Sequence, residues 1–145
     1  MPSVTLGHRD GDRITISVLD RMHKGASDYW DGNWLVSPVE FTVGAYCGTI
    51  GAGLRVEELI GLRRQLETAY AEHGGAARLA SMEEWVDLTI EVSESGDVEI
   101  QGNFVDQPGY GNRLAFTIAG LDRTALPDVI GALLEIEDAF PILGA

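Results

Sequence analysis

Several side chains that could bind a metal ion or transfer protons lie in or near one short segment, "DYWDGNWL", at residues 28–35. Asp28 and Asp31 supply carboxylates at close spacing, and His23 precedes them in the same polar loop. Asp106, in a second polar turn, would complete a ligand or acid–base site if the fold brought the four together. The segment lacks the full spacing and terminal glutamate of a calcium loop, and loop aspartates commonly bond local backbone N–H groups.

The same segment is rich in aromatic side chains. Tyr29, Trp30 and Trp34 fall within it, and they include two of the three tryptophans of the chain. Tryptophan and tyrosine dominate binding energy at protein interfaces, so exposed members would serve as a hot spot. If buried, the same rings would close one end of the core. Both interpretations stay open here, and Tyr110, in the second polar turn, is a further candidate for contact with a partner.

Other reactive residues have no supporting pattern. Cys47 is the single cysteine and lies in a strand-like run, which is typical of a small core residue. His8 and His73 have no nucleophile at a recognisable catalytic spacing. The glycine-rich run "GTIGAG" lacks the Gly-Lys-Ser/Thr of a phosphate-binding loop. The sequence therefore predicts no catalytic residue, no metal ligand set and no cofactor.

Net charge is the strongest compositional signal. The 145 residues carry 23 acidic and 10 basic side chains, for a formal net charge of -13. Such a surface repels phosphates, which argues against nucleic-acid binding, and it speeds encounter with a basic partner. No apolar run approaches the roughly 20 residues of a membrane span, and no signal peptide is evident. A single domain over residues 1–145 and a cytoplasmic location are expected.

Hydrophobic periodicity predicts strands that alternate with two helices. Apolar stripes at helical spacing predict helices over residues 56–73 and 126–140. Period-two alternation predicts strands over 13–20, 34–43, 77–82, 85–92, 97–105 and 113–120, with a further strand running from a turn at Gly44 through Gly53.

Strands joined by short turns pair in antiparallel fashion, and each has one apolar face. The expected fold is therefore α+β: a single twisted, mainly antiparallel sheet of about six to seven strands, with two helices on one face. The other face of that sheet would be open and acidic, with Arg113 as its main opposing charge. Its carboxylates would be Glu40, Asp87, Glu91 and Glu99.

Four stretches together resemble a known family: "DYWDGNWL", "LRVEELIGLRRQLETAY", "DQPGYGNRLAFTI" and "LPDVIGALLEIEDAF". Over roughly residues 13–140 the chain is similar to the bacterial WapI-type immunity proteins and their uncharacterised relatives. The resemblance implies a small cytosolic protein that neutralises a polymorphic toxin domain by binding it. It implies no enzyme activity and no cofactor, and it does not indicate which surface binds.

The leading hypothesis is a non-enzymatic binding protein that blocks a basic toxin domain. In it, the four outward carboxylates steer the encounter, and Trp30, Trp34 and Tyr110 anchor the complex. One alternative is a small-ligand or metal-binding module, or an enzyme, that uses His23, Asp28 and the two other loop aspartates. A second alternative is a structural protein that buries its open face in a homodimer.

Overall fold

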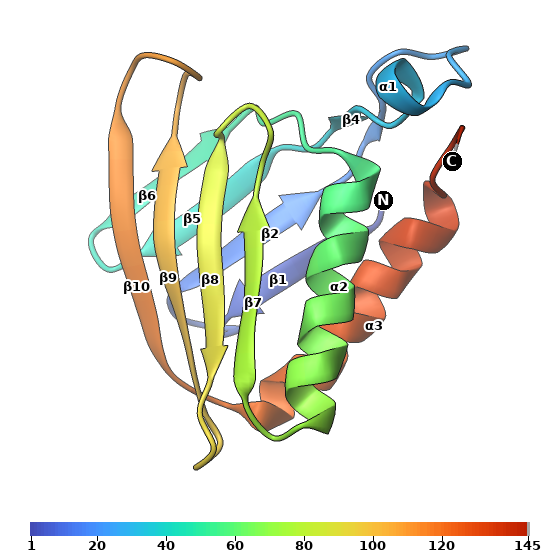
Figure 1. Cartoon of the computed structure of the whole chain (residues 1–145). Coiled ribbons are helices and arrows are strands. Elements are labelled where there is room, and N and C mark those ends of the chain that lie inside the picture. Colours follow the sequence, from blue (N-terminus) through green and yellow to red (C-terminus); the bar gives the residue numbers. More distant parts are fainter. Residues whose placement is uncertain (145) are drawn as a thin grey trace.

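Two four-stranded antiparallel sheets face each other in the computed structural model, which describes residues 1–144 (Figure 1). The first sheet has the strand order β1–β2–β5–β6, and these strands are β1 (Ser3–Gly7), β2 (Arg13–Ser17), β5 (Val39–Val43) and β6 (Tyr46–Ile50). The second has the order β10–β9–β8–β7, and its strands are β7 (Gly75–Ala80), β8 (Val86–Val92), β9 (Asp97–Val105) and β10 (Arg113–Asp122). The remaining elements are β3 (Asp20–Arg21) paired with β4 (Leu35–Val36), a 3₁₀ turn (Arg123–Ala125), and the helices α1 (Tyr29–Gly32), α2 (Val56–Ala71) and α3 (Leu126–Ala139).

Three phenylalanine rings join the two sheets. The ring of Phe104, from β9, lies between Phe41 of β5 and Phe116 of β10, with 4.6 Å between centroids on either side. The planes of neighbouring rings differ by 20° or less, so the rings are stacked. Phe104 is almost completely buried. The stack therefore fixes the contact between the sheets at the side where β10 crosses β5.

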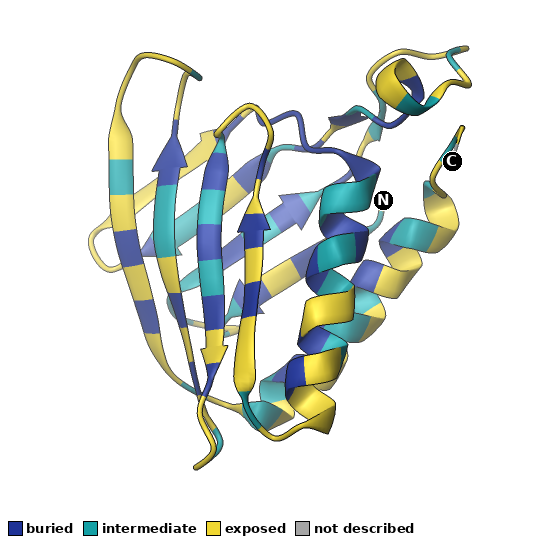
Figure 2. Cartoon of the chain, viewed as in Figure 1, coloured by how far each residue is buried: buried dark blue, intermediate teal, exposed yellow. Residues whose placement is uncertain are grey.

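The two long helices close the opposite side of the sandwich. α2 packs beside β7, α3 packs beside β1, and the helices pack against each other. Figure 2 shows the buried residues of both helices on the sides that face the sheets. These are the predicted apolar stripes, which include Leu59, Leu62 and Leu66 on α2 and Val129, Leu133 and Ile136 on α3. Within residues 1–144, no helix is both long and apolar enough to cross a membrane.

The predicted α+β class and both long helices are confirmed, but the single sheet is wrong. Alternation shows that a strand has one buried face and does not show which strands share a sheet. Here α2 carries the chain from the last strand of the first sheet to the first strand of the second. The prediction also missed β1, and it placed His23, Asp28 and Asp31 in a polar loop, part of which folds into α1.

Candidate functional site

Most of the aromatic segment folds into α1, a helix of one turn. Asp28 is its N-cap: a side-chain oxygen accepts a hydrogen bond from the backbone N–H of Asp31 at 3.1 Å. This contact satisfies one of the N–H groups that a helix leaves unpaired at its start. The carboxylate of Asp28 thus has a structural role, as loop aspartates commonly do.

A buried arginine that the sequence analysis overlooked holds this turn in place. Arg55 has no solvent-exposed surface and precedes α2 directly. Its guanidinium donates to the carbonyl oxygens of Trp30 at 2.7 Å and Tyr29 at 2.8 Å, and to the carboxylate of Glu57. The guanidinium carbon also lies 4.7 Å from the ring centroid of Trp34, and slightly over 5 Å from the centroids of the other two aromatic rings.

This arrangement accounts for the aromatic segment. A guanidinium is planar and only weakly hydrated, so it can be buried among aromatic faces while its N–H groups reach carbonyl oxygens. The sequence does carry a signal for it. Arg55 is a lone charge between Leu54 and Val56, both of them buried, at the start of the predicted helix 56–73.

The C-terminal segment also contacts the α1 region, through hydrogen bonds between Asn33 and Leu143. Asn33 is fully buried, and its amide nitrogen donates to the carbonyls of Tyr29 and Leu143, each at 2.9 Å. Its amide oxygen accepts from the backbone N–H of Leu143, also at 2.9 Å. Arg21 donates to the carbonyl of Gly32 at 2.8 Å and to that of Pro141. The side chains of Arg55, Arg21 and Asn33, the last of which directly follows α1, therefore hold α1 against the start of α2 and the end of the chain.

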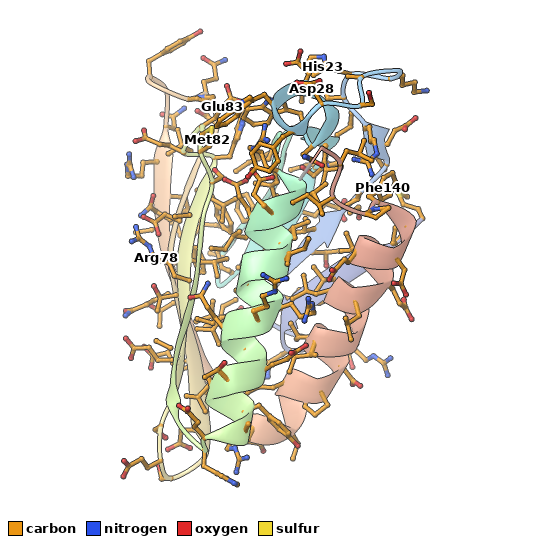
Figure 3. All side chains as sticks on the ribbon, turned by 45° about the vertical axis from the view of Figure 1, so that its right-hand side comes forward. His23, Asp28, Arg78, Met82, Glu83 and Phe140 are labelled. Carbon is orange, nitrogen blue, oxygen red and sulfur yellow. The ribbon has the colours of Figure 1, made fainter. Side chains whose placement is uncertain are left out.

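One aromatic side chain of the segment projects from this rigid support. Trp30 is 61% exposed, whereas Tyr29 and Trp34 are partly buried around the arginine. Two exposed methionines, Met22 and Met82, lie at the same end of the molecule. Figure 3 shows Met82 there together with His23 and Asp28, beyond the N-terminal end of α2. We refer to Met22, Trp30 and Met82 as the α1-end surface.

Each methionine has a contact that places it at this end of the molecule. A β-carbon placed on Gly53 would lie 2.9 Å from Cε of Met22 and 3.9 Å from Oε1 of Glu83, so both side chains border this glycine. The backbone N–H of Met82 donates to Oε2 of Glu58 at 2.6 Å, next to the start of α2.

Carboxylates lie next to the residues of the α1-end surface. Asp31 follows Trp30 in the chain, Glu83 follows Met82, and Glu57 contacts Arg55. Lys24, the one lysine of the chain, is paired with Asp20 at 2.8 Å. Burial raises the pKa of Glu58 although its oxygens accept hydrogen bonds from two backbone N–H groups, which act in the opposite direction. This end of the molecule therefore combines apolar surface with an acidic border.

The four carboxylates that were expected to share one acidic sheet face do not lie on the same sheet, so that prediction is wrong. Glu40 lies on β5 of the first sheet, whereas Asp87, Glu91 and Glu99 lie on β8 and β9 of the second. The pKa of Asp87 is lowered by hydrogen bonds from Arg78, whose guanidinium nitrogens lie 3.0 and 2.8 Å from its oxygens.

Two of these carboxylates lie side by side on the second sheet. Glu91 and Glu99 are direct cross-strand neighbours, and neither has an ion-pair partner among residues 1–144. Like charges in such positions repel each other, which destabilises the strand pair.

The residues of the predicted ligand site do not meet. Asp106 lies on the β9–β10 turn, far from α1 in Figure 1, and accepts hydrogen bonds from the backbone and side chain of Asn112 at 2.8 and 3.0 Å. These bonds lower the pKa of Asp106. Residues 1–144 contain no group of three or more His, Cys, Asp or Glu side chains placed to hold a metal ion. Tyr110, on the same turn, is 75% exposed.

Comparison with known proteins agrees with the resemblance seen in the motifs. A search of curated proteins gave no match to the chain. The model of one family, described as the immunity protein WapI-like family, matches residues 5–141. That match runs from within β1 to beyond the end of α3 and so includes α1, Arg55 and both sheets. The chain therefore belongs to the WapI-like immunity protein family.

Proposed function

We propose that this protein is a cytoplasmic, non-enzymatic immunity protein, which neutralises a basic toxin domain by binding it through the α1-end surface. The observation that carries the proposal is the exposed indole of Trp30 on a turn that Arg55 and Asn33 immobilise. The family membership supports a toxin as the partner.

The structural setting of Trp30 suits a binding anchor. A side chain on a backbone already fixed by buried hydrogen bonds loses little conformational freedom when a partner covers it. Met22 and Met82, exposed at the same end of the molecule, add flexible apolar surface that can adapt to the shape of a partner. Tryptophan at the centre of such a patch is the residue type most often responsible for binding energy.

Charge supports a basic partner. The net charge of -13 and the carboxylates around the α1-end surface would attract a cationic protein and accelerate association at low salt. Glu91 and Glu99 add negative potential on the second sheet and would contribute to steering from a distance. Tyr110 and Glu40 enter the proposal as peripheral contacts, because both are exposed on elements other than α1.

Co-expression tests this function directly. Each polymorphic-toxin domain encoded in the source genome, beginning with any that is encoded beside this chain, would be expressed with and without it. We expect growth to be restored with one such domain, and the two purified proteins to form a complex whose association slows as salt is added. If no toxin domain is neutralised or bound, the proposed function is wrong.

A further inference from the structure

Three of the four sheet edges are covered or interrupted. The β7 edge is capped by Gln65 of α2, whose amide donates to the carbonyl of Arg78 at 3.1 Å and accepts from its N–H at 2.9 Å. The β1 edge packs beside α3. The β10 edge has a register shift between Ile118 and Leu121, where His8 lies 2.7 Å from the carbonyl oxygen of Ala119. Such features prevent unwanted pairing with other chains.

The fourth edge, β6, lacks this protection. Four of its five residues are exposed, and the strand is visible as a largely exposed ribbon in Figure 2. The stretch 44–53 around it contains no charged residue and no proline, and four of its ten residues are glycine. Natural proteins commonly place lysine, proline or a bulge on an open edge to block strand addition. The β6 edge has a backbone accessible to another strand.

The register identifies the backbone groups that are free. Ser37 donates to the carbonyl of Ala52 at 3.1 Å, in line with the β5–β6 ladder. Hydrogen-bonded pairs recur at every second residue of an antiparallel ladder. The bonded pairs are therefore Val39–Ile50, Phe41–Gly48 and Val43–Tyr46. The N–H and C=O groups of Cys47 and Thr49 consequently point away from β5, toward the position of an absent neighbouring strand.

We propose that the β6 edge accepts an extended strand from a basic partner protein, which extends the first sheet by one strand. The backbone groups of Cys47 and Thr49 would pair with that strand, as in other cases of strand addition. This inference deepens the proposed function and rests on it for the identity of the partner. The chain leads from this edge toward the α1-end surface, because Gly53, three residues beyond β6, lies next to the side chain of Met22.

The negative net charge of this chain favours a strand from a basic partner over a strand from a second copy of the chain. Two copies would each bring a net charge of -13 to the contact and would repel each other. Glu40 is the cross-strand neighbour of Thr49, so a carboxylate lies one strand away from the added strand. Lysine or arginine on the exposed face of the incoming strand would be attracted to it.

The test uses a synthetic peptide of about ten residues that alternates lysine with valine, long enough to cover the edge. It would be added to the full-length protein at millimolar concentration, with backbone amide hydrogen exchange and NMR shifts as readouts. We expect the amides of Cys47 and Thr49 to become protected, while those of Gly48 and Ile50, already bonded to β5, change little. A peptide with glutamate in place of lysine is expected to bind more weakly.

A proline substitution provides the matched variants. Thr49→Pro removes only an outward N–H, which edge strands tolerate, and is expected to weaken peptide binding by about tenfold or more. Thr49→Val keeps the N–H and is expected to bind like the unmodified protein. If Thr49→Pro does not fold, the amide exchange of the unmodified protein still decides the question.

Three results would overturn the inference. The first is an absence of protection at Cys47 and Thr49, and the second is binding that Thr49→Pro leaves unchanged. The third is protection that rises with protein concentration alone, which would mean that a second copy occupies the edge. A toxin domain that binds without protecting these amides refutes the inference and leaves the proposed function intact. If the peptide pairs with β6 but no toxin domain binds the protein, the proposed function is refuted and the inference about the β6 edge stands.

Discussion

The guanidinium carbon of Arg55 lies 4.7 Å from the centre of the Trp34 ring, at a position with no access to solvent. A charge buried there is stable because carbonyl oxygens, a carboxylate and aromatic faces replace its hydration. The two residues also form an isolated antiparallel bridge, which joins the segment after α1 to the start of α2. Arg55 therefore determines the shape of the surface that presents Trp30.

Replacing Arg55 with lysine should destabilise the fold. Lysine keeps the charge, but it cannot reach two carbonyls and a carboxylate at once or stack on the rings. We expect Arg55→Lys to lower the free energy of unfolding by about 2 kcal/mol, measured by urea denaturation. Arg63→Lys is the control. Arg63 pairs with Glu67 and Glu137 at a partly exposed site and should lose less than about 1 kcal/mol. Equal losses would contradict the central role of Arg55.

Replacing Trp30 with alanine should separate binding from stability. Because the indole is 61% exposed and its carbonyl contact with Arg55 is retained, we expect the free energy of unfolding to fall by less than about 1 kcal/mol. Affinity for the toxin partner should fall by about thirtyfold, measured by calorimetry. Tyr110→Ala removes a more exposed aromatic side chain from the β9–β10 turn. A larger loss for Tyr110→Ala than for Trp30→Ala would move the interface to that turn.

Glu58 should make a specific contribution to the pH dependence of stability. Its pKa in the folded protein is raised above the ordinary value of 4.5, mainly by burial. The folded state therefore binds this proton more tightly than the unfolded chain does. The stability that results is fully present below pH 4.5 and is lost as pH rises through the raised pKa.

The Glu58→Gln variant isolates this effect. The free energy of unfolding of the unmodified protein minus that of Glu58→Gln should decrease across the window just above pH 4.5, in urea titrations at a series of pH values. Glu135→Gln, at an exposed position on α3, makes the same chemical change and serves as the matched control. A difference that increases with pH would mean that hydrogen bonding, rather than burial, dominates at Glu58.

Gly102 on β9 should tolerate no side chain. A β-carbon there would lie 2.0 Å from the carbonyl oxygen of Asp87 and 2.6 Å from Cα of Leu88, and both are backbone atoms. We expect Gly102→Ala to lower the free energy of unfolding by about 3 kcal/mol or more. Gly61→Ala on α2, where the added carbon would meet no atom within 4 Å apart from its chain neighbours and the adjacent backbone of its own helix, should instead raise it by about 1 kcal/mol. Thermal denaturation of both variants checks the opposite signs.

Relieving the Glu91–Glu99 repulsion should stabilise the second sheet. Glu99→Lys places opposite charges in a direct cross-strand pair and should raise the free energy of unfolding by about 0.5 kcal/mol. If this pair steers a basic toxin, the same variant will associate more slowly at low salt, by stopped-flow measurement, with little change in dissociation. Glu135→Lys makes the same change in net charge on α3, so equal slowing would indicate an effect of total charge alone.

Local features of the fold were predictable because they depend on neighbours in the sequence. The stripes that include Leu62 and Leu133 recur at helical spacing, and both helices form within two residues of the expected bounds. The alternation of Leu88 and Ile90 likewise matches the buried face of β8. The motifs along the chain were also sufficient to suggest the family.

Tertiary structure alone decided how these elements combine. Period-two alternation marks a buried face without naming the opposing layer, so the two sheets and the stack around Phe104 were not predictable. Glu40 was therefore placed on the same face as Glu91, although they lie on different sheets. The role of Arg55 depends on carbonyl groups 25 and 26 residues away in the chain. Such contacts form only when the fold brings distant backbone together: a lone charge between Leu54 and Val56 marks Arg55 in the sequence but does not identify its partners.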